Sequence, residues 1–166
     1  MRLLDTEKLV KNVYSREKIR TALAICNLVA TGFTVIVFLC LLVYFATDST
    51  ALLLGCIATL GVPFGLVTLL RRVINAPRPY EVYEFFDEPV ENKSGESFPS
   101  RHCFSIFAIG TLCLFASVPV GIFTLALGVV LCFCRVALGF HFVRDVVTGG
   151  IIGIISSLIG GFILIL

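Results

Sequence analysis

The only two histidines of the chain, His102 and His141, each stand close to an arginine in the sequence, and Asp145 follows His141 by four residues. A spacing of four lets two side chains share one face where a helix begins. A carboxylate that accepts one ring N–H of a histidine fixes its tautomer, so the second ring nitrogen is free to attack phosphorus. His141 is therefore a candidate nucleophile oriented by Asp145, although an aspartate near a helix start can also serve as a cap.

His102 follows Pro99, Ser100 and Arg101 at an expected helix start. Helix N-termini bind anions through their backbone N–H groups, and the Ser100 hydroxyl could add a further donor to phosphate oxygens. His102 could then donate a proton to the departing alkoxide. The alternative is an ordinary Pro-Ser helix start with an incidental histidine at the membrane interface.

Four arginines are expected at the same membrane level as the histidines, at the ends of different apolar stretches: Arg71, Arg78, Arg101 and Arg135. An arginine at mid-bilayer costs about 2.5 to 3.5 kcal/mol, and less toward the interface. Guanidinium groups bind phosphate oxygens in bidentate geometry, so such a cluster makes physical sense around a multiply charged anion. The alternative is arginines that reach up to lipid headgroups, which is our interpretation for Arg72 and Arg144.

Long apolar stretches must position these side chains. Of the 166 residues, 58% are hydrophobic and 14% are charged, and the mean hydropathy is +1.02. Backbone polar groups within a bilayer must be satisfied inside their own segment, which favours helices. We expect an all-α, integral membrane helical bundle of about five transmembrane helices, at residues 22–46, 51–70, 120–138 and 146–166 with a shorter one at 102–118.

Residues 1–20 form a separate segment ahead of the expected transmembrane domain, 21–166, in which residues 71–101 make the active-site loop. Four apolar side chains of the first segment recur at helical spacing: Leu9, Val10, Val13 and Tyr14. This pattern is typical of an amphipathic helix that lies on the membrane surface. A frayed, solvated tail is the alternative, and the sequence favours neither.

All thirteen lysines and arginines fall on one side of the expected bundle, six of them within residues 1–20. The opposite turns, 47–50 and 117–119, contain only Asp48 among charged residues. The positive-inside rule therefore places the N-terminus and the active-site loop in the cytoplasm. We expect an integral protein of a bacterial cell (inner) membrane with its active site on the cytoplasmic side.

Composition argues against other kinds of site. The seven cysteines lie mostly within apolar stretches, their number is odd and no C-x-x-C pair occurs, so we interpret them as small buried hydrophobes. A net charge of +2 is too weak to indicate a nucleic-acid partner. A metal site of His102, His141 and Asp145 is a further alternative, but nearby arginines make cation binding electrostatically poor, and we expect no metal and no cofactor.

Three motifs occur in order and at defined intervals: Arg71-x6-Arg78-Pro79, Pro99-Ser100-Arg101-His102 and Cys134-Arg135-x5-His141-x3-Asp145. They resemble Lys-x6-Arg-Pro, Pro-Ser-Gly-His and Ser-Arg-x5-His-x3-Asp, the motifs of the type 2 phosphatidic acid phosphatases, also called lipid phosphate phosphatases. The resemblance covers residues 71–145, a little under half of the chain, and the combined spacing is highly specific. The core of that family usually has six spans, one more than we expect here.

The resemblance implies a role for each matching residue: His141 is the nucleophile, Asp145 orients it, His102 is the general acid, and Arg71, Arg78, Ser100 and Arg135 bind phosphate. Three positions depart from the family. Arg71 replaces a lysine, which keeps the charge and adds a planar fork. Arg101 replaces a glycine, and its side chain could join the phosphate-binding set or read the substrate headgroup. Cys134 replaces a serine and is a poorer hydrogen-bond donor, so we do not count it as a ligand.

The resemblance implies metal-independent hydrolysis of a lipid phosphate monoester or diphosphate through a phosphohistidine intermediate. The substrate would be a phospholipid such as phosphatidic acid or phosphatidylglycerol phosphate, or a polyprenyl phosphate, presented by the bilayer. One alternative is a phosphotransferase that uses an acceptor other than water. Another is a non-catalytic membrane protein that binds anionic lipid, although binding alone needs no nucleophile. The oligomeric state stays open.

Two further segments carry a pattern. Residues 80–97 interleave six acidic side chains with four aromatic ones, which could be a lid that selects headgroups or a solvated loop with an aromatic anchor. The last apolar stretch places a small residue every four positions, which predicts a helix-packing face: Gly149, Gly153, Ser157 and Gly161.

Overall fold

The computed structural model describes residues 3–83 and 94–165, and every regular element within these ranges is a helix. The all-helical expectation is therefore confirmed. In chain order the helices are α1 (Leu3–Tyr14), α2 (Glu17–Asp48), α3 (Thr50–Ile74), the single turn α4 (Pro79–Val82), α5 (Arg101–Ala116), α6 (Val118–Ala137) and α7 (Val143–Ile165).

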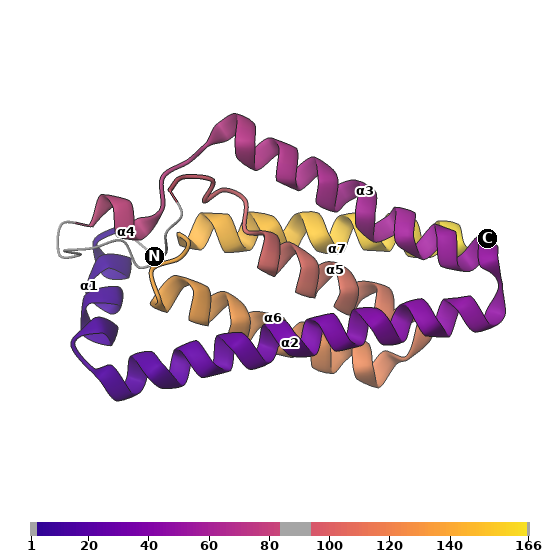
Figure 1. Ribbon diagram of the computed structural model, residues 1–166, viewed down its shortest axis with the longest axis horizontal. Coiled ribbons are helices and arrows are strands. Elements are labelled where there is room, and N and C mark those ends of the chain that lie inside the picture. The colour runs from indigo at the N-terminus through magenta and orange to yellow at the C-terminus, as the bar shows by residue number, and fades with distance from the viewer. Residues whose placement is uncertain (1–2, 84–93, 166) are drawn as a thin grey trace.

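The long helices run along the long axis of one bundle (Figure 1). α2 and α3 form a hairpin, and its turn is fixed by Ser49, whose hydroxyl accepts the N–H of Leu52 at 3.1 Å and so caps α3. The C-terminal end of α7 lies at the same end of the bundle as this turn, whereas α1 and α4 lie at the other (Figure 1). The N-terminal segment and the chain that follows α3 thus share one end.

Four stretches are long and apolar enough to cross a bilayer: Glu17–Asp48, Thr50–Val82, Val118–Ala137 and Val143–Leu164. The protein is an integral membrane protein. α5 has 16 residues, which extend about 24 Å, somewhat less than the roughly 30 Å of a hydrocarbon core. Most of α5 is buried among the other helices, from Cys103 to Cys113, so it occupies the centre of the bundle. A fifth span at α5 stays a prediction.

α7 packs against α5, and its small residues lie in the buried side: Gly149, Gly153, Ser157 and Gly161. A Cβ at Gly149 would meet the carbonyl oxygen of Ser100, and one at Gly153 would meet the carbonyl oxygen of Phe104. The predicted packing face is thereby confirmed within a single bundle. Because the two backbones approach so closely, the N-terminal half of α7 is held against the start of α5.

The N-terminal segment is helical over Leu3–Tyr14, so the frayed-tail alternative is wrong for these residues. Val10 is fully buried and packs with Tyr83 and Phe142. The Tyr14 hydroxyl donates to the carbonyl oxygen of Leu138 at 3.1 Å. The apolar side of α1 is therefore docked on the end of the bundle, over the connection between α6 and α7, and contact with the membrane surface stays a prediction.

Replacing Gly153 by alanine should destabilise the bundle, because the added methyl group would meet the Phe104 carbonyl and push α7 away from α5. Overpacking of this kind costs about 1 to 3 kcal/mol. Gly65→Ala is the matched control, since a Cβ there has open space and alanine favours a helix. Denaturant unfolding in detergent should show a lower midpoint for Gly153→Ala only, and equal midpoints for both variants would contradict this account of the packing.

Candidate active site

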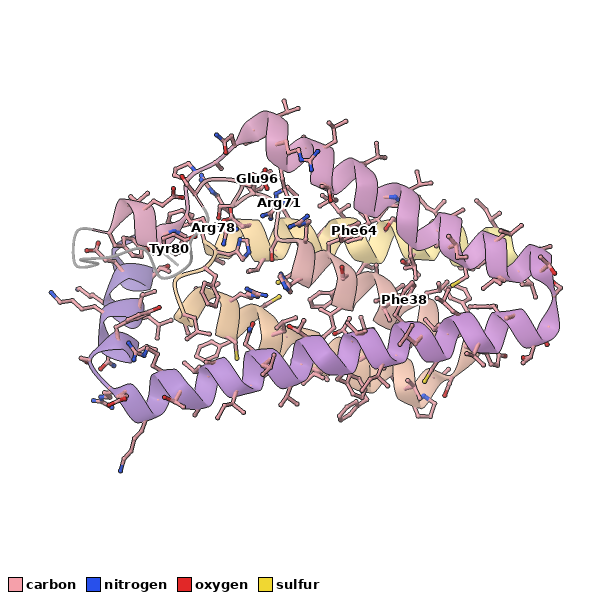
Figure 2. The ribbon with its side chains drawn as sticks, viewed as in Figure 1. Phe38, Phe64, Arg71, Arg78, Tyr80 and Glu96 are labelled. Atoms are coloured by element: carbon pink, nitrogen blue, oxygen red, sulfur yellow. The ribbon has the colours of Figure 1, made fainter. Side chains whose placement is uncertain are left out.

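The polar residues that the sequence singles out gather at the end of the bundle that carries α1 and α4; Figure 2 shows Arg71 and Arg78 there. They come from the end of α3, residues 94–100, the starts of α5 and α7 and the end of α6. Six of them are exposed by 5% or less: Arg71, Arg78, Ser100, Arg135, His141 and Asp145. Buried charges are costly unless they are paired, so their mutual arrangement matters.

All eight predicted site residues converge in space. His102 lies within electrostatic range of His141 and of three arginines, Arg71, Arg101 and Arg135. Arg71 is within electrostatic range of Arg78, which repels it, and of Asp145, which attracts it. Ser100 joins the group because its N–H donates to the carbonyl oxygen of Asp145 at 2.9 Å.

The end of α6 sets the interval between Arg135 and His141. Gly139 adopts a left-handed conformation with φ 73°, which ends the helix and folds the chain back. The N–H groups of Phe140 and His141 then donate to the carbonyl oxygen of Arg135 at 3.0 and 3.2 Å. A spacing of six positions therefore places His141 beside the last turn of the helix that carries Arg135.

Asp145 is fully buried and acts both as a helix cap and as the partner of His141. Its Oδ2 accepts the N–H of Phe142 at 3.0 Å, which caps the start of α7, and lies 3.8 Å from Nδ1 of His141. The Ser97 hydroxyl donates to the same Oδ2 at 2.5 Å and lies 3.4 Å from His141 Nδ1. Arg144, which we expected at lipid headgroups, places Nε 3.4 Å from Oδ1.

His141 lies in the connection between α6 and α7. Burial lowers the pKa of His141 below its ordinary value, the positive charges of Arg135 and Arg78 act in the same direction, and Asp145 offsets part of the shift. The imidazole is therefore neutral at pH 7 and keeps a lone pair. Because Nδ1 is directed at Asp145 and Ser97, Nε2 is the nitrogen that remains for a substrate.

Two arginines hold the chain that leads into α5. Nη1 of Arg71 donates to the carbonyl oxygens of Pro99 and Ser97 at 2.5 and 3.3 Å. Nε of Arg78 donates to the carbonyl oxygen of Gly95 at 3.0 Å. These arginines, predicted only as phosphate ligands, therefore also fix the backbone that carries Ser97 and Ser100.

Some buried donors still have capacity for a ligand. Within residues 3–83 and 94–165, Nε of Arg71 and the hydroxyl of Ser100 have no hydrogen-bond partner. Ser100 is the N-cap residue of α5, yet its side chain makes no cap hydrogen bond there. A buried donor without a partner costs free energy, and an anion bound at the start of α5 would satisfy both.

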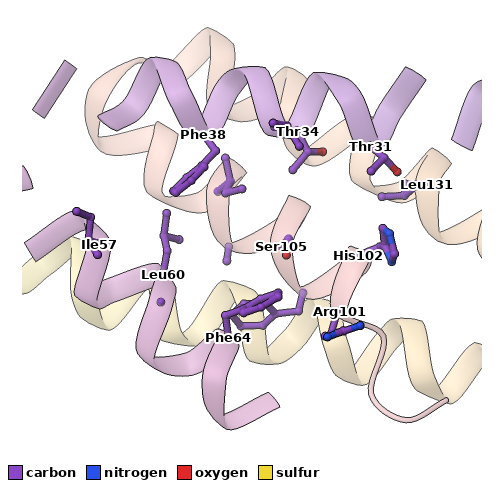
Figure 3. A pocket seen from close by; sticks show the side chains of 15 residues that line it. Thr31, Thr34, Phe38, Ile57, Leu60, Phe64, Arg101, His102, Ser105 and Leu131 are labelled. Carbon is purple, nitrogen blue, oxygen red and sulfur yellow. The ribbon is translucent and has the colours of Figure 1, made fainter. Parts of the chain in front are cut away.

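An apolar cavity of about 560 Å³ lies between α2, α3 and α5 and reaches the site at Arg101 and His102 (Figure 3). Its walls are almost entirely hydrophobic, with Phe38, Leu60 and Phe64 among them. The guanidinium of Arg101 lies 6.0 Å from the ring centroid of Phe64, a cation–π contact at the polar end of the cavity.

Sequence reasoning missed Ser97, and it placed Glu81 only among the acidic residues of a lid or solvated loop. Ser97 had no signal of its own, because a single serine at the end of a polar loop carries no periodicity or motif. Glu81 accepts hydrogen bonds from the Ser94 hydroxyl at 2.6 Å and from the Gly95 N–H, and so ties α4 to the start of the loop. The lid interpretation rests mainly on residues 84–93, which lie outside the described residues.

The comparisons with known proteins give a family and a fold. Residues 49–161, about two thirds of the chain, match the family model of the PAP2 superfamily, and this range contains all eight site residues. A comparison with curated proteins gives no match.

Two solved structures resemble the whole bundle. LpxE from Aquifex aeolicus has 22% sequence identity and a TM-score of 0.74, with 95% of this chain and 93% of that chain covered. A PAP2-type transmembrane phosphatidylglycerolphosphate phosphatase from Bacillus subtilis has 22% identity and a TM-score of 0.68, with 96% and 84% covered. Both alignments cover at least 95% of this chain, so the shared fold extends beyond the range of the family match.

Asp145→Asn should lower the pKa of His141 further, because the carboxylate is the group that favours the imidazolium form. NMR titration of imidazole-labelled protein can measure this in a His102→Ala background, where His141 is the only histidine. Asp48→Asn is the matched control, since Asp48 is exposed and is the last residue of α2, at the far end of the bundle. An unchanged or higher pKa in Asp145→Asn would show that the pair is not coupled.

Proposed function

The chain belongs to the PAP2 superfamily, and from this premise we propose that it is a metal-independent membrane phosphatase that cleaves a lipid phosphate through a phosphohistidine at His141. The observation that carries the proposal is the orientation of His141, with Nδ1 toward Asp145 and Ser97 and Nε2 left for phosphorus. The neutral ring and the buried arginines around it support the same chemistry.

In the first step, Nε2 of His141 attacks the phosphorus in line with the leaving oxygen. The N–P bond forms while the P–O bond to the lipid breaks, and the electron pair stays on the lipid oxygen. His102 donates a proton to that oxygen as general acid. Asp145 stabilises the positive charge that develops on the His141 ring, and the hydroxyl of Ser97 holds the carboxylate in place.

The arginines act on the transferring phosphoryl group. In the transition state, negative charge is spread over the equatorial oxygens, and fixed guanidinium groups stabilise it without a metal ion. We assign this role to Arg71, Arg78 and Arg135, with the Ser100 hydroxyl and the N-terminal turn of α5 as further donors.

In the second step, water replaces the histidine. His102, which gave up its proton in the first step, takes one from the attacking water. The new O–P bond forms as the P–N bond breaks, so inorganic phosphate leaves and His141 returns to its neutral form. One water is consumed for each phosphate released, and transfer to another acceptor would require that acceptor to enter in place of water.

The cavity supports a lipid substrate over a soluble phosphate ester. It is about 560 Å³ in volume, lined mainly by apolar side chains together with Thr31, Thr34 and Ser105, and open to His102 at one end. A hydrocarbon chain buried in such a cavity contributes about 0.8 kcal/mol for each methylene group. The Bacillus subtilis relative by fold is a phosphatidylglycerolphosphate phosphatase, which makes phosphatidylglycerol phosphate one candidate beside phosphatidic acid and polyprenyl phosphates.

We also propose the membrane arrangement. α5 would be the fifth span, shortened because the bundle surrounds it, and α1 would lie at the cytoplasmic interface as a segment distinct from the transmembrane domain. The positive residues of the N-terminal segment support a cytoplasmic active site, and the two bacterial relatives by fold support a bacterial cell membrane.

His141→Ala should lower the rate of phosphate release from lipid phosphates by about 1000-fold or more, because the variant lacks the imidazole nitrogen that we propose as the nucleophile. Activity of the unmodified protein should persist in EDTA and be inhibited by vanadate, which mimics five-coordinate phosphorus. Quench of a single turnover with labelled lipid in alkaline detergent should leave phosphate on His141, because the N–P bond of phosphohistidine is stable in base and hydrolyses in acid.

Two controls separate chemistry from folding. Asp48→Asn changes an exposed charge at the far end of the bundle and should retain full activity. Unfolding midpoints should match between His141→Ala and the unmodified protein. Full activity of a well-folded His141→Ala would refute the phosphohistidine mechanism, and release that requires an added acceptor would favour a phosphotransferase.

The orientation can be tested with single added cysteines at the two ends of the bundle. Lys11 in α1 and Asp48 at the end of α2 are both exposed. In intact cells, a membrane-impermeant maleimide should label Asp48→Cys but leave Lys11→Cys unlabelled until the cells are lysed. The unmodified chain measures any labelling of the native cysteines. Labelling of Lys11→Cys alone in intact cells would reverse the orientation.

A further inference from the structure

The guanidinium of Arg101 is a positive charge at the boundary between the phosphate site and the apolar cavity. It lies over Phe64, is half-buried, and lines the same cavity as His102 (Figure 3). Among the described residues no carboxylate forms a salt bridge with it, whereas Arg71 is near enough to repel it. A charge in such surroundings is stabilised by an anion on the ligand.

The position of Arg101 relative to His102 indicates which part of the substrate this anion belongs to. His102 protonates the leaving oxygen in the proposed mechanism, so the leaving group lies on the side of the site that His102 faces. The cavity that would hold the leaving lipid begins at His102 and Arg101 together. Arg101 is therefore placed against the leaving group, while Arg71, Arg78 and Arg135 surround the transferring phosphoryl group.

Resting on the proposed function, we propose that Arg101 selects a substrate whose leaving group carries its own phosphate, namely a lipid diphosphate. His141 would attack the terminal phosphorus, and the P–O bond to the bridging oxygen would break. The electron pair stays on the bridging oxygen, which takes the proton of His102 and leaves as part of a lipid monophosphate. Water then releases inorganic phosphate from His141.

The chemistry of the leaving group separates the possible substrates. Phosphatidic acid leaves behind an uncharged diacylglycerol, which offers Arg101 no partner. Phosphatidylglycerol phosphate leaves a phosphodiester that is separated from the leaving oxygen by a glycerol unit. In a diphosphate the second phosphate is directly bonded to the leaving oxygen, next to His102, where an arginine one residue away can form a charge-assisted hydrogen bond.

The test compares two substrates with one tail, farnesyl diphosphate and farnesyl monophosphate, by initial rates of phosphate release in detergent. The unmodified protein should have the higher kcat/KM for the diphosphate. Arg101→Gln should lower the ratio of kcat/KM for the diphosphate to kcat/KM for the monophosphate by about 10- to 100-fold. This is the change expected when a hydrogen bond between charged groups is lost. Arg101→Lys should retain part of the ratio, because it keeps the charge but loses the planar fork.

Arg72→Gln is the matched control, since it removes an exposed arginine at the end of α3 and should leave the ratio unchanged. Equal kcat/KM values in the unmodified protein, or an equal loss with both substrates in Arg101→Gln, would overturn the assignment and return Arg101 to the transferring phosphate. If Arg101→Gln lowers kcat/KM more for phosphatidylglycerol phosphate than for farnesyl diphosphate, the assignment of a diphosphate substrate is also overturned. If no lipid phosphate releases phosphate, or if His141→Ala stays active, the proposed function itself fails.

Discussion

The carboxylate of Asp145 joins the parts of the site. One oxygen accepts the Ser97 hydroxyl and the Phe142 N–H and faces Nδ1 of His141, and the backbone carbonyl of the same residue accepts the N–H of Ser100. A single residue therefore fixes the relative positions of four parts of the site: the loop before α5, the start of α5, the nucleophile and the start of α7. A buried carboxylate tolerates this environment because several donors and nearby positive charges stabilise its ionised form.

This arrangement requires α5 and α7 to approach closely, which the absence of side chains at Gly149 and Gly153 allows. Any larger residue at Gly149 would meet the backbone carbonyl of Ser100, the same residue whose hydroxyl we assign to phosphate. A packing feature within the membrane thus sets a distance in the polar site. Helix pairs that contact through small residues gain van der Waals contacts and backbone proximity, both of which favour a rigid site.

Much of the fold and of the candidate site could be predicted from the sequence, for reasons that differ between elements. The helices follow from apolar stretches of bilayer length, and the convergence of His102, His141 and the arginines follows from short turns that return the chain to one end. The sequence offered capping and pairing with His141 as alternatives for Asp145. The structure shows both contacts, because one carboxylate oxygen has lone pairs for the Phe142 N–H and for the imidazole, while the orienting role in catalysis stays a prediction. Ser97 could not be found, since its role depends on a contact with a residue 48 positions away. The docking of α1 likewise depends on Tyr83 and Phe142, which no local pattern connects to Val10.

The two hydrogen bonds from Arg71 to loop carbonyls explain how a cluster of like charges can be stable before any substrate binds. Each bond satisfies part of a guanidinium with backbone oxygen, whose partial negative charge lowers the cost of burial without adding a full counter-charge. A carboxylate in the same place would neutralise the arginine and compete with phosphate. The carbonyl partners add no full negative charge beyond the nearby Glu96 and Asp145, and they leave Nε of Arg71 as an available donor. The fold therefore holds the arginines in place while keeping their charge for the phosphoryl group, which is the condition for electrostatic stabilisation that needs no rearrangement during the reaction.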